Sequence, residues 1–218
     1  MAGTRVAIET GTKRAFASAL DWPGWCRSGR DERAAMEALE RYAERYALVP
    51  EIAGVRFPKT AAAELEVIER LRGGAATDFG VPEMHAAVEK RPMSKSELDR
   101  MCDLLAACWK VFDATVEKAP PELRKGPRGG GRDRDKIVEH VLGSELAYAS
   151  KLGVKLKQPD IGDRDGIAAH RAALLGALRA GADGKPMRER GWPARYAARR
   201  MAWHVMDHAW EIEDRTEA

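Results

Sequence analysis

Apolar residues recur with a two-residue period at the start of the chain. Residues 5–9 (RVAIE) and 14–20 (RAFASAL) alternate apolar with small or polar side chains, and the Gly-Thr-Lys between them suits a hairpin turn. Pro23 and Gly24 mark a second turn, after which CRSG at residues 26–29 has the length of a short third strand. This pattern predicts antiparallel strands.

Helical spacing replaces the alternation after Asp31, which is a good helix N-cap residue. In DERAAMEALERYAERY the apolar positions lie three and four residues apart, as on one face of a helix. A further strand is expected in EIAGVRF, at residues 51–57. The order β-β-β-α-β predicts a small α+β domain over residues 1–58.

Residues 59–93 are interpreted as a connecting segment. AAAELEVIERLR, at residues 61–72, is expected to be a helix that Gly73 and Gly74 end. The rest of the segment mixes turn residues with one short helical pattern.

From Ser94 onward the periodicity is helical throughout. Ser94 and Glu97 form a Ser-x-x-Glu capping box, and the two prolines at 120 and 121 end the first helix. Three more helices are expected, at residues 133–152, 163–178 and 193–214. Four helices with no strand between them predict an all-α, up-and-down four-helix bundle over residues 94–218.

Composition narrows the class of protein. The 218 residues are 44% hydrophobic and 33% charged, which is typical of a globular chain, and the net charge of +3 is too small to indicate nucleic-acid binding. No apolar run approaches the roughly 18 residues of a membrane helix, and the N-terminus lacks a signal-peptide pattern, so we expect a cytoplasmic protein. Three scattered cysteines favour reduced thiols over a disulfide framework.

Three of the five histidines can meet in such a bundle. His204 and His208 lie four residues apart in MAWHVMDHAWEIEDR, on one helix face, and His140 lies on the helix at 133–152. Three imidazoles with a vacant fourth position are the ligand set of a catalytic divalent metal. The alternative is that they are hydrogen-bonded core residues. The string HVMDH is not the HExxH of zinc proteases, and His85 and His170, without partners at ligand spacing, are expected on the surface.

Residues 94–218 resemble the DinB/YfiT-like family of metal-dependent four-helix-bundle enzymes. The resemblance rests on one histidine on the second helix, His140 in IVEHVLGSELAY, and a His-x-x-x-His pair on the fourth, His204 and His208. It implies a bound divalent metal, for which we expect zinc, with nickel, iron and manganese as alternatives. It also implies a small-molecule substrate and either hydrolysis or S-transfer from a low-molecular-weight thiol, as in relatives that act with mycothiol or bacillithiol.

Neighbouring residues on the same helices are candidates for catalysis. Glu211 follows His208 by three residues, Asp207 follows His204 by three, and either could hold the second ring nitrogen of a ligand, as could Glu145. Tyr148, two turns beyond His140, is a candidate proton donor. Solvent-exposed faces, helix–helix ion pairs and core packing are the alternatives for these residues.

A basic, glycine-rich loop joins the first two helices. Its sequence PPELRKGPRGGGRDRDK includes Arg128, Arg132 and Arg134, which could grip a carboxylate or phosphate of the substrate. An ordinary solvated connection is the alternative. One basic loop without interleaved aromatic residues does not indicate nucleic-acid binding.

The stretch ASALDWPGWCRSGRDERAAMEALERY resembles the small HicB-like α+β fold. No DNA-binding segment follows it, so we interpret it as an accessory domain for homodimerisation or for covering the bundle. Trp203 and Trp210 are expected to pack within the bundle or at its junction with this domain. The alternative function is a non-enzymatic binding or regulatory protein that recognises a partner through the HicB-like domain.

Overall fold

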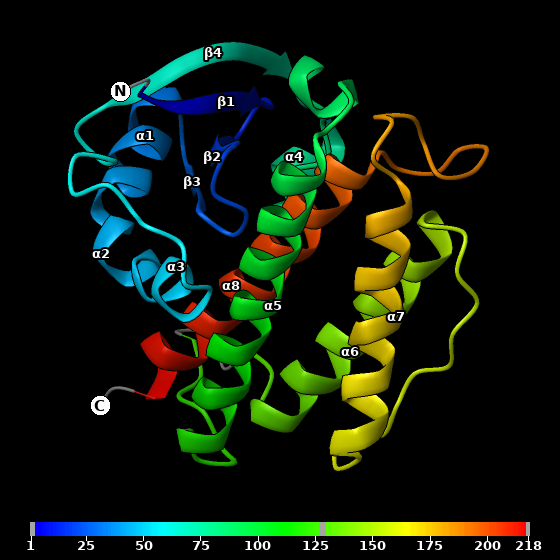
Figure 1. The fold of residues 1–218 in the computed structure, drawn as a ribbon. Helices are drawn as coiled ribbons and strands as arrows, with labels where there is room; N and C mark the ends of the chain where they lie inside the picture. The colour runs from blue at the N-terminus through cyan, green and yellow to red at the C-terminus, as the bar shows by residue number, and fades with distance from the viewer. Residues whose placement is uncertain (1–2, 127–129, 217–218) are drawn as a thin grey trace.

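The first three strands form where the two-residue period predicts them. In the computed structural model, which describes residues 3–126 and 130–216, β1 (Thr4–Thr10), β2 (Ala15–Ala19) and β3 (Cys26–Gly29) are antiparallel neighbours. Ile8 lies opposite Ala17 in the first pair, and Ala17 lies opposite Arg27 in the second. The predicted α+β class is confirmed, with the sheet at the N-terminus and long helices after it (Figure 1).

The fourth strand lies outside the range that the sequence predicted. β4 (Leu65–Arg72) pairs in parallel with β1, giving the sheet order β3-β2-β1-β4, so the helix expected over residues 61–72 is wrong. Partly buried positions, among them Leu65 and Val67, alternate with exposed ones along β4. This is the period of an edge strand with one covered face, and the sheet therefore extends past residue 58.

The strand expected over residues 51–57 is also wrong. The chain instead forms three consecutive short helices and then a loop, in which the partly buried Phe57 packs edge-on against Trp22 and Trp25 at 4.8 and 5.5 Å between ring centroids. Within residues 51–57, Ala53, Val55 and Phe57 pack partly buried against the core without joining the sheet, whereas Ile52 is exposed. The helices are α1 (Glu32–Arg41), α2 (Ala43–Tyr46) and α3 (Leu48–Ile52).

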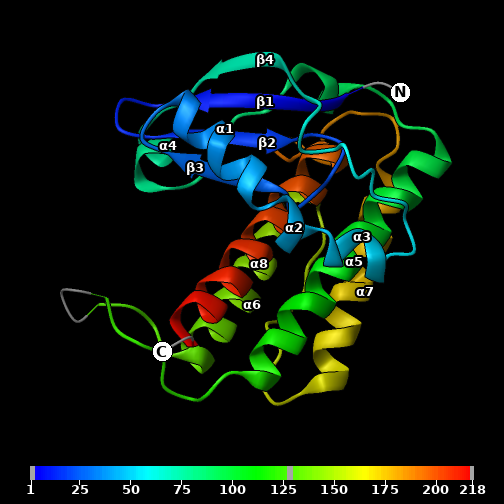
Figure 2. The ribbon, with the colours of Figure 1, turned by 90° about the vertical axis from the view of Figure 1, so that its left-hand side faces the viewer.

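Helices cover both faces of the sheet (Figure 2). Ala17 of β2 belongs to the same buried cluster as Leu39 of α1, whereas the adjacent Phe16 contacts Trp203 of the last helix on the opposite face. Both faces of β2 are therefore buried, and all five of its residues are buried. This explains why small alanines dominate a strand that must accommodate close packing on two sides.

The four long helices form as the sequence predicts. They are α5 (Lys95–Lys118), α6 (Arg134–Lys151), α7 (Arg164–Ala180) and α8 (Ala194–Thr216). The expected capping box at the start of α5 is present, with the Ser94 side chain accepting from the Glu97 amide and Glu97 accepting from the Ser94 amide. Between β4 and α5 lie only the short helices α4 (Ala75–Phe79) and η1 (Ala87–Lys90). Among the residues described, no helix is long and apolar enough to cross a membrane.

α8 joins the sheet to the other long helices. Trp203 packs edge-on against Phe16, with ring centroids 6.0 Å apart, and Trp210 packs against Tyr42, which follows α1, at 4.9 Å. These contacts confirm the expected junction. A buried ion pair reinforces it: Arg199, 3% exposed, donates from Nη2 to Oε2 of Glu89 in η1 at 3.0 Å, and Glu89 is 1% exposed.

We expect Glu89→Gln to lower the free energy of unfolding by about 3 kcal/mol, because it leaves the buried Arg199 guanidinium without a countercharge. Glu37→Gln is the matched control, since Glu37 pairs with Arg33 on the exposed surface of α1, where such pairs contribute at most about 1 kcal/mol. Urea denaturation of both variants measures the difference. Equal effects would contradict a stabilising role for the buried pair.

Candidate metal centre

Three histidine rings meet between α6 and α8. Nε2 of His140 lies 3.2 Å from Nε2 of His204, and the three residues His140, His204 and His208 each offer a ring nitrogen within 4.8 Å of the other two. The ring centroids are 4.7 to 5.1 Å apart. The predicted convergence of the three histidines is therefore present. Small changes in side-chain rotamer would bring the three nitrogens within bonding distance of a single cation.

Burial favours the neutral form of two of these imidazoles, His204 and His140. His204 is only 7% exposed, and burial, followed by the nearby His208, lowers its pKa well below the usual value. Burial and the same neighbour also lower the pKa of the half-buried His140. A neutral imidazole has a lone pair available for coordination, whereas imidazolium does not.

Glu211 fixes the orientation of His208. Its Oε2 lies 2.8 Å from Nδ1 of His208, and its Oε1 accepts from Nη1 of Arg215 at 2.7 Å. Although burial raises the pKa of Glu211, the contacts with His208 and Arg215 outweigh it and keep the pKa below the usual value. Because Glu211 occupies Nδ1, His208 presents Nε2 to the other rings. This is the arrangement by which carboxylates hold metal-binding histidines.

Tyr148 of α6 lies on the other side of the histidines. Its ring is edge-on to His204, with centroids 5.8 Å apart, and tilted against Trp192 at 5.2 Å. The side chain is buried, and burial raises the pKa of its hydroxyl, so the hydroxyl stays protonated at neutral pH. Tyr148 can therefore donate a hydrogen bond or a proton beside His204.

Two of the carboxylates expected near the histidines lie elsewhere. Asp207 accepts from Nη1 of Arg27 on β3 at 3.0 Å and so ties α8 to the sheet. Glu145 is buried against Arg171 of α7, with Oε1 3.4 Å from its Nε. The helical spacing was right, but each carboxylate pairs with an arginine on the neighbouring element, because a buried or half-buried carboxylate is stabilised most by a nearby cation.

The basic loop contributes less than its composition suggests. Arg134 is the first residue of α6 and donates to the Ala119 carbonyl at 2.9 Å, so it links the two ends of the loop. Arg132 is exposed, and its charge is close enough to help lower the pKa of His140 after burial and His208. Arg128 lies outside the described residues.

The remaining histidines and the cysteines do not belong to this centre. His170 is buried, contrary to the expected surface position, and its Nδ1 lies 3.3 Å from the Lys157 carbonyl. His85 is stacked on Tyr196 with centroids 3.7 Å apart. The three cysteines are free and buried, and burial raises the pKa of Cys26 and of Cys102 to about 11, as expected for inert thiols.

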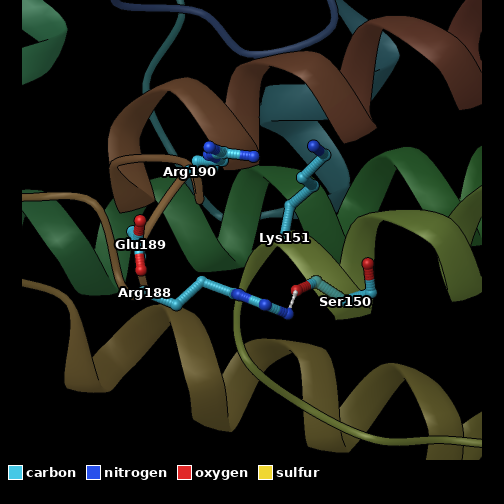
Figure 3. Close-up of a pocket in the computed structure, with 5 residues that line it drawn as sticks. All are labelled: Ser150, Lys151, Arg188, Glu189 and Arg190. Atoms are coloured by element: carbon cyan, nitrogen blue, oxygen red, sulfur yellow. Dashed lines mark hydrogen bonds between the residues drawn. The ribbon is translucent and has the colours of Figure 1, made fainter.

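A surface pocket lies at the C-terminal end of α6 (Figure 3). Arg188 crosses its floor and donates from Nη1 to the Ser150 carbonyl at 3.0 Å. The other lining residues are Lys151, Glu189 and Arg190. The Trp192 amide donates to the Lys151 carbonyl at 3.2 Å and so ties the loop that lines the pocket to the end of α6.

Sequence reasoning missed Arg200. It lies one helical turn before His204, is 7% exposed, and its guanidinium lies 5.2 Å from the Tyr148 ring centroid. The spacing of four residues from His204 was the available signal. It was overlooked because arginines on a helix are normally exposed.

The donor set fits a divalent cation. Nitrogens that share a tetrahedral cation at bond lengths of about 2.0 to 2.1 Å lie about 3.3 Å apart, and His140 and His204 are already 3.2 Å apart at Nε2. Two neutral imidazole nitrogens at this distance need a shared proton or a shared cation between them. The three histidines could therefore bind a metal ion.

Replacing Glu211 with alanine should weaken zinc binding by about 10- to 100-fold, because His208 then loses the carboxylate that orients it. Glu213→Ala is the control: Glu213 is on the same helix and pairs with Arg45 at 2.7 Å. Competition with a chromophoric chelator measures both affinities. Equal losses in the two variants would contradict the orienting role.

The metal-free protein should lose stability as the pH falls from about 7 towards 5. His204 and His140 have lowered pKa values in the folded state, so below the unfolded value of about 6.5 the unfolded chain binds more protons. His204→Gln should flatten this dependence in urea unfolding measured across the range. Some slope will persist, since burial also lowers the pKa of His85 and His170. An unchanged slope in the variant would refute the assignment to His204.

Comparison of this chain with protein-family models, with curated proteins and with solved structures finds no match. The centre must therefore be interpreted from its own geometry: three imidazoles from two helices, one of them held by a carboxylate, with the buried Tyr148 beside His204.

Proposed function

We propose that this chain is a metal-dependent enzyme in which His140, His204 and His208 hold one divalent cation. The observation that carries the proposal is the convergence of three ring nitrogens within 4.8 Å, from helices that are more than 40 residues apart in the sequence. Chance pairs on one helix are common, but a third histidine from a separate helix at the same point is not explained by helical spacing alone.

The arrangement of the histidines supports the proposal that the chain is of the DinB type. In this proposal α5 to α8 form the up-and-down four-helix bundle of that family, with the single histidine on the second long helix and the pair on the fourth. The order and spacing of His140, His204 and His208 agree with that pattern. The N-terminal sheet is then an accessory HicB-like domain, attached to the bundle through contacts such as Arg27 with Asp207.

Zinc is the cation that this donor set favours, because three imidazole nitrogens suit its tetrahedral preference, and nickel, iron and manganese are alternatives. When bound, the cation would supply a Lewis acid that lowers the pKa of a water molecule or thiol. Glu211 holds His208 in place, and Tyr148 can donate a proton to a leaving group. These residues serve either hydrolysis or transfer of a low-molecular-weight thiol to an electrophile.

Protein purified without a histidine tag should contain close to one equivalent of metal, and His204→Ala should lose it together with any stabilisation by added zinc. His170→Ala is the matched control, because His170 is a buried histidine on α7 outside the cluster. Elemental analysis and melting temperatures with and without zinc, nickel or manganese test this.

Turnover is measured on the same two variants with ester substrates and with thiol–electrophile pairs. His204→Ala should reduce it at least about 100-fold, whereas His170→Ala should retain it. Absence of metal in the wild-type protein, with no thermal response to added metal, would overturn the proposal. Metal binding without turnover of any substrate would favour a binding protein.

A further inference from the structure

Three arginines of α8 are buried, and they differ in their interaction partners. Arg195 has Glu97 at 3.5 Å, and Arg199 has Glu89 at 3.0 Å between Nη2 and Oε2. Arg200, as buried as Arg195 at 7% exposed, has no carboxylate partner among the described residues, and its Nη1 is fully covered without a hydrogen-bond partner. Arg195 also has one covered nitrogen, Nε, without a hydrogen-bond partner, but of these three arginines Arg200 alone lacks a carboxylate partner among the described residues.

An unpaired buried charge is costly to the folded state. Removing a charge from water without a compensating partner costs several kcal/mol in proteins, so such groups are rare. Stacking offsets part of this cost, since the Arg200 guanidinium lies 4.4 Å from the Trp203 ring centroid and 5.2 Å from that of Tyr148. Stacking does not satisfy the covered Nη1, whose N–H groups lie in the plane of the guanidinium and lack an acceptor among the described residues.

The same two rings connect Arg200 to the histidines. Tyr148 and Trp203 each contact His204 as well, with ring centroids 5.8 and 5.9 Å from it. Arg200 precedes His204 by one helical turn, so the two side chains lie on one face of α8. The positive charge of Arg200 is close enough to oppose protonation of His204. The guanidinium therefore forms one wall of the metal centre.

The two groups on this wall, the Arg200 guanidinium and the Tyr148 hydroxyl, can both donate hydrogen bonds to an anion. A guanidinium has five N–H donors and no acceptor. The buried Tyr148 hydroxyl beside it is protonated, and Glu145, the carboxylate three residues before Tyr148, is paired with Arg171. Among the described groups, the one carboxylate that contacts the histidines is Glu211, on the side of His208 and already shared with Arg215. A cation at the histidines would add to this excess of positive charge.

We infer that Arg200, together with the Tyr148 hydroxyl, binds an anionic group of the substrate, a carboxylate or a phosphate, beside the three histidines. This deepens the proposed function and rests on it for the identity of the ligand as a substrate. It places the anion-binding groups between α6 and α8, next to the three histidines. The exposed Arg132 of the loop then has at most an outer role. Arginine suits the task because its planar fork matches two oxyanion oxygens.

The test titrates acetate and inorganic phosphate, at constant ionic strength, into the full-length protein after metal removal. Melting temperature and calorimetry report binding. Arg200→Met removes the charge while retaining length and packing, and it should weaken binding of the preferred anion at least tenfold, whereas Arg200→Lys should retain part of it. A response to acetate alone indicates a carboxylate substrate, and a stronger response to phosphate indicates a phosphate.

Arg195→Met is the matched control, because Arg195 is equally buried on the same helix but is paired with Glu97. It should lower the melting temperature and leave anion binding unchanged. Arg200→Met should raise the melting temperature of the ligand-free protein, since it removes an uncompensated charge. A structural stacking role predicts the opposite: a lower melting temperature in Arg200→Met and unchanged anion binding. That result, or a wild-type protein that binds neither anion, would overturn the inference.

Metal content separates this inference from the proposed function. Arg200→Met should retain its metal, because the three histidines are intact. If the metal is present but anion binding does not depend on Arg200, the inference fails and the metal centre stands. If anion binding depends on Arg200 but the wild-type protein holds no metal, the metal-dependent function fails and the anion site stands.

Discussion

The structure depends on the burial of α8 on nearly all sides. Sixteen of its 23 residues are buried, among them three arginines and one of its two histidines. A helix in this position cannot send its polar side chains to water, so each needs a partner on a neighbouring element. The choice of partner divides the helix into two rows. Arg199, Trp203 and Asp207 contact the sheet and its connections, and Arg200, His204 and His208 face α6.

These two rows explain why one helix can both hold the fold together and carry the candidate site. Residues four apart share a face, and adjacent rows differ by about 100° around the axis. Arg199 and Arg200 are consecutive, yet the first reaches Glu89 of η1 and the second reaches Tyr148 of α6. The ion pair and the tryptophan contacts fix the rotation of α8, and this rotation in turn sets where the histidines point. The N-terminal sheet thus helps to position the centre without contributing a ligand.

The sequence was sufficient where periodicity alone determines the outcome. The long helices and the shared face of His204 and His208 follow from a 3.6-residue repeat that local spacing reveals, whereas the approach of His140 also requires α6 to pack beside α8. The sequence was insufficient where pairing between distant segments determines the secondary structure or the partner of a side chain. β4 contains a pattern that suits either a helix or an edge strand, and only its parallel pairing with β1 selects the strand. Likewise, Asp207 has the right spacing to hold His204, but Arg27, 180 positions away in the sequence, provides a stronger partner.

Arg200 could not be predicted from the sequence for a different reason. Its distinguishing feature is the lack of a carboxylate partner among the described residues. Sequence patterns reveal which groups can meet, but they do not show which buried group stays unmatched once all the others have paired. Such a group persists only if the surrounding structure is stable enough to tolerate its cost. A buried guanidinium without a carboxylate partner, beside three imidazoles, is a local departure from the pairing of the other buried arginines on α8. Departures of this kind are expected where a ligand completes the structure.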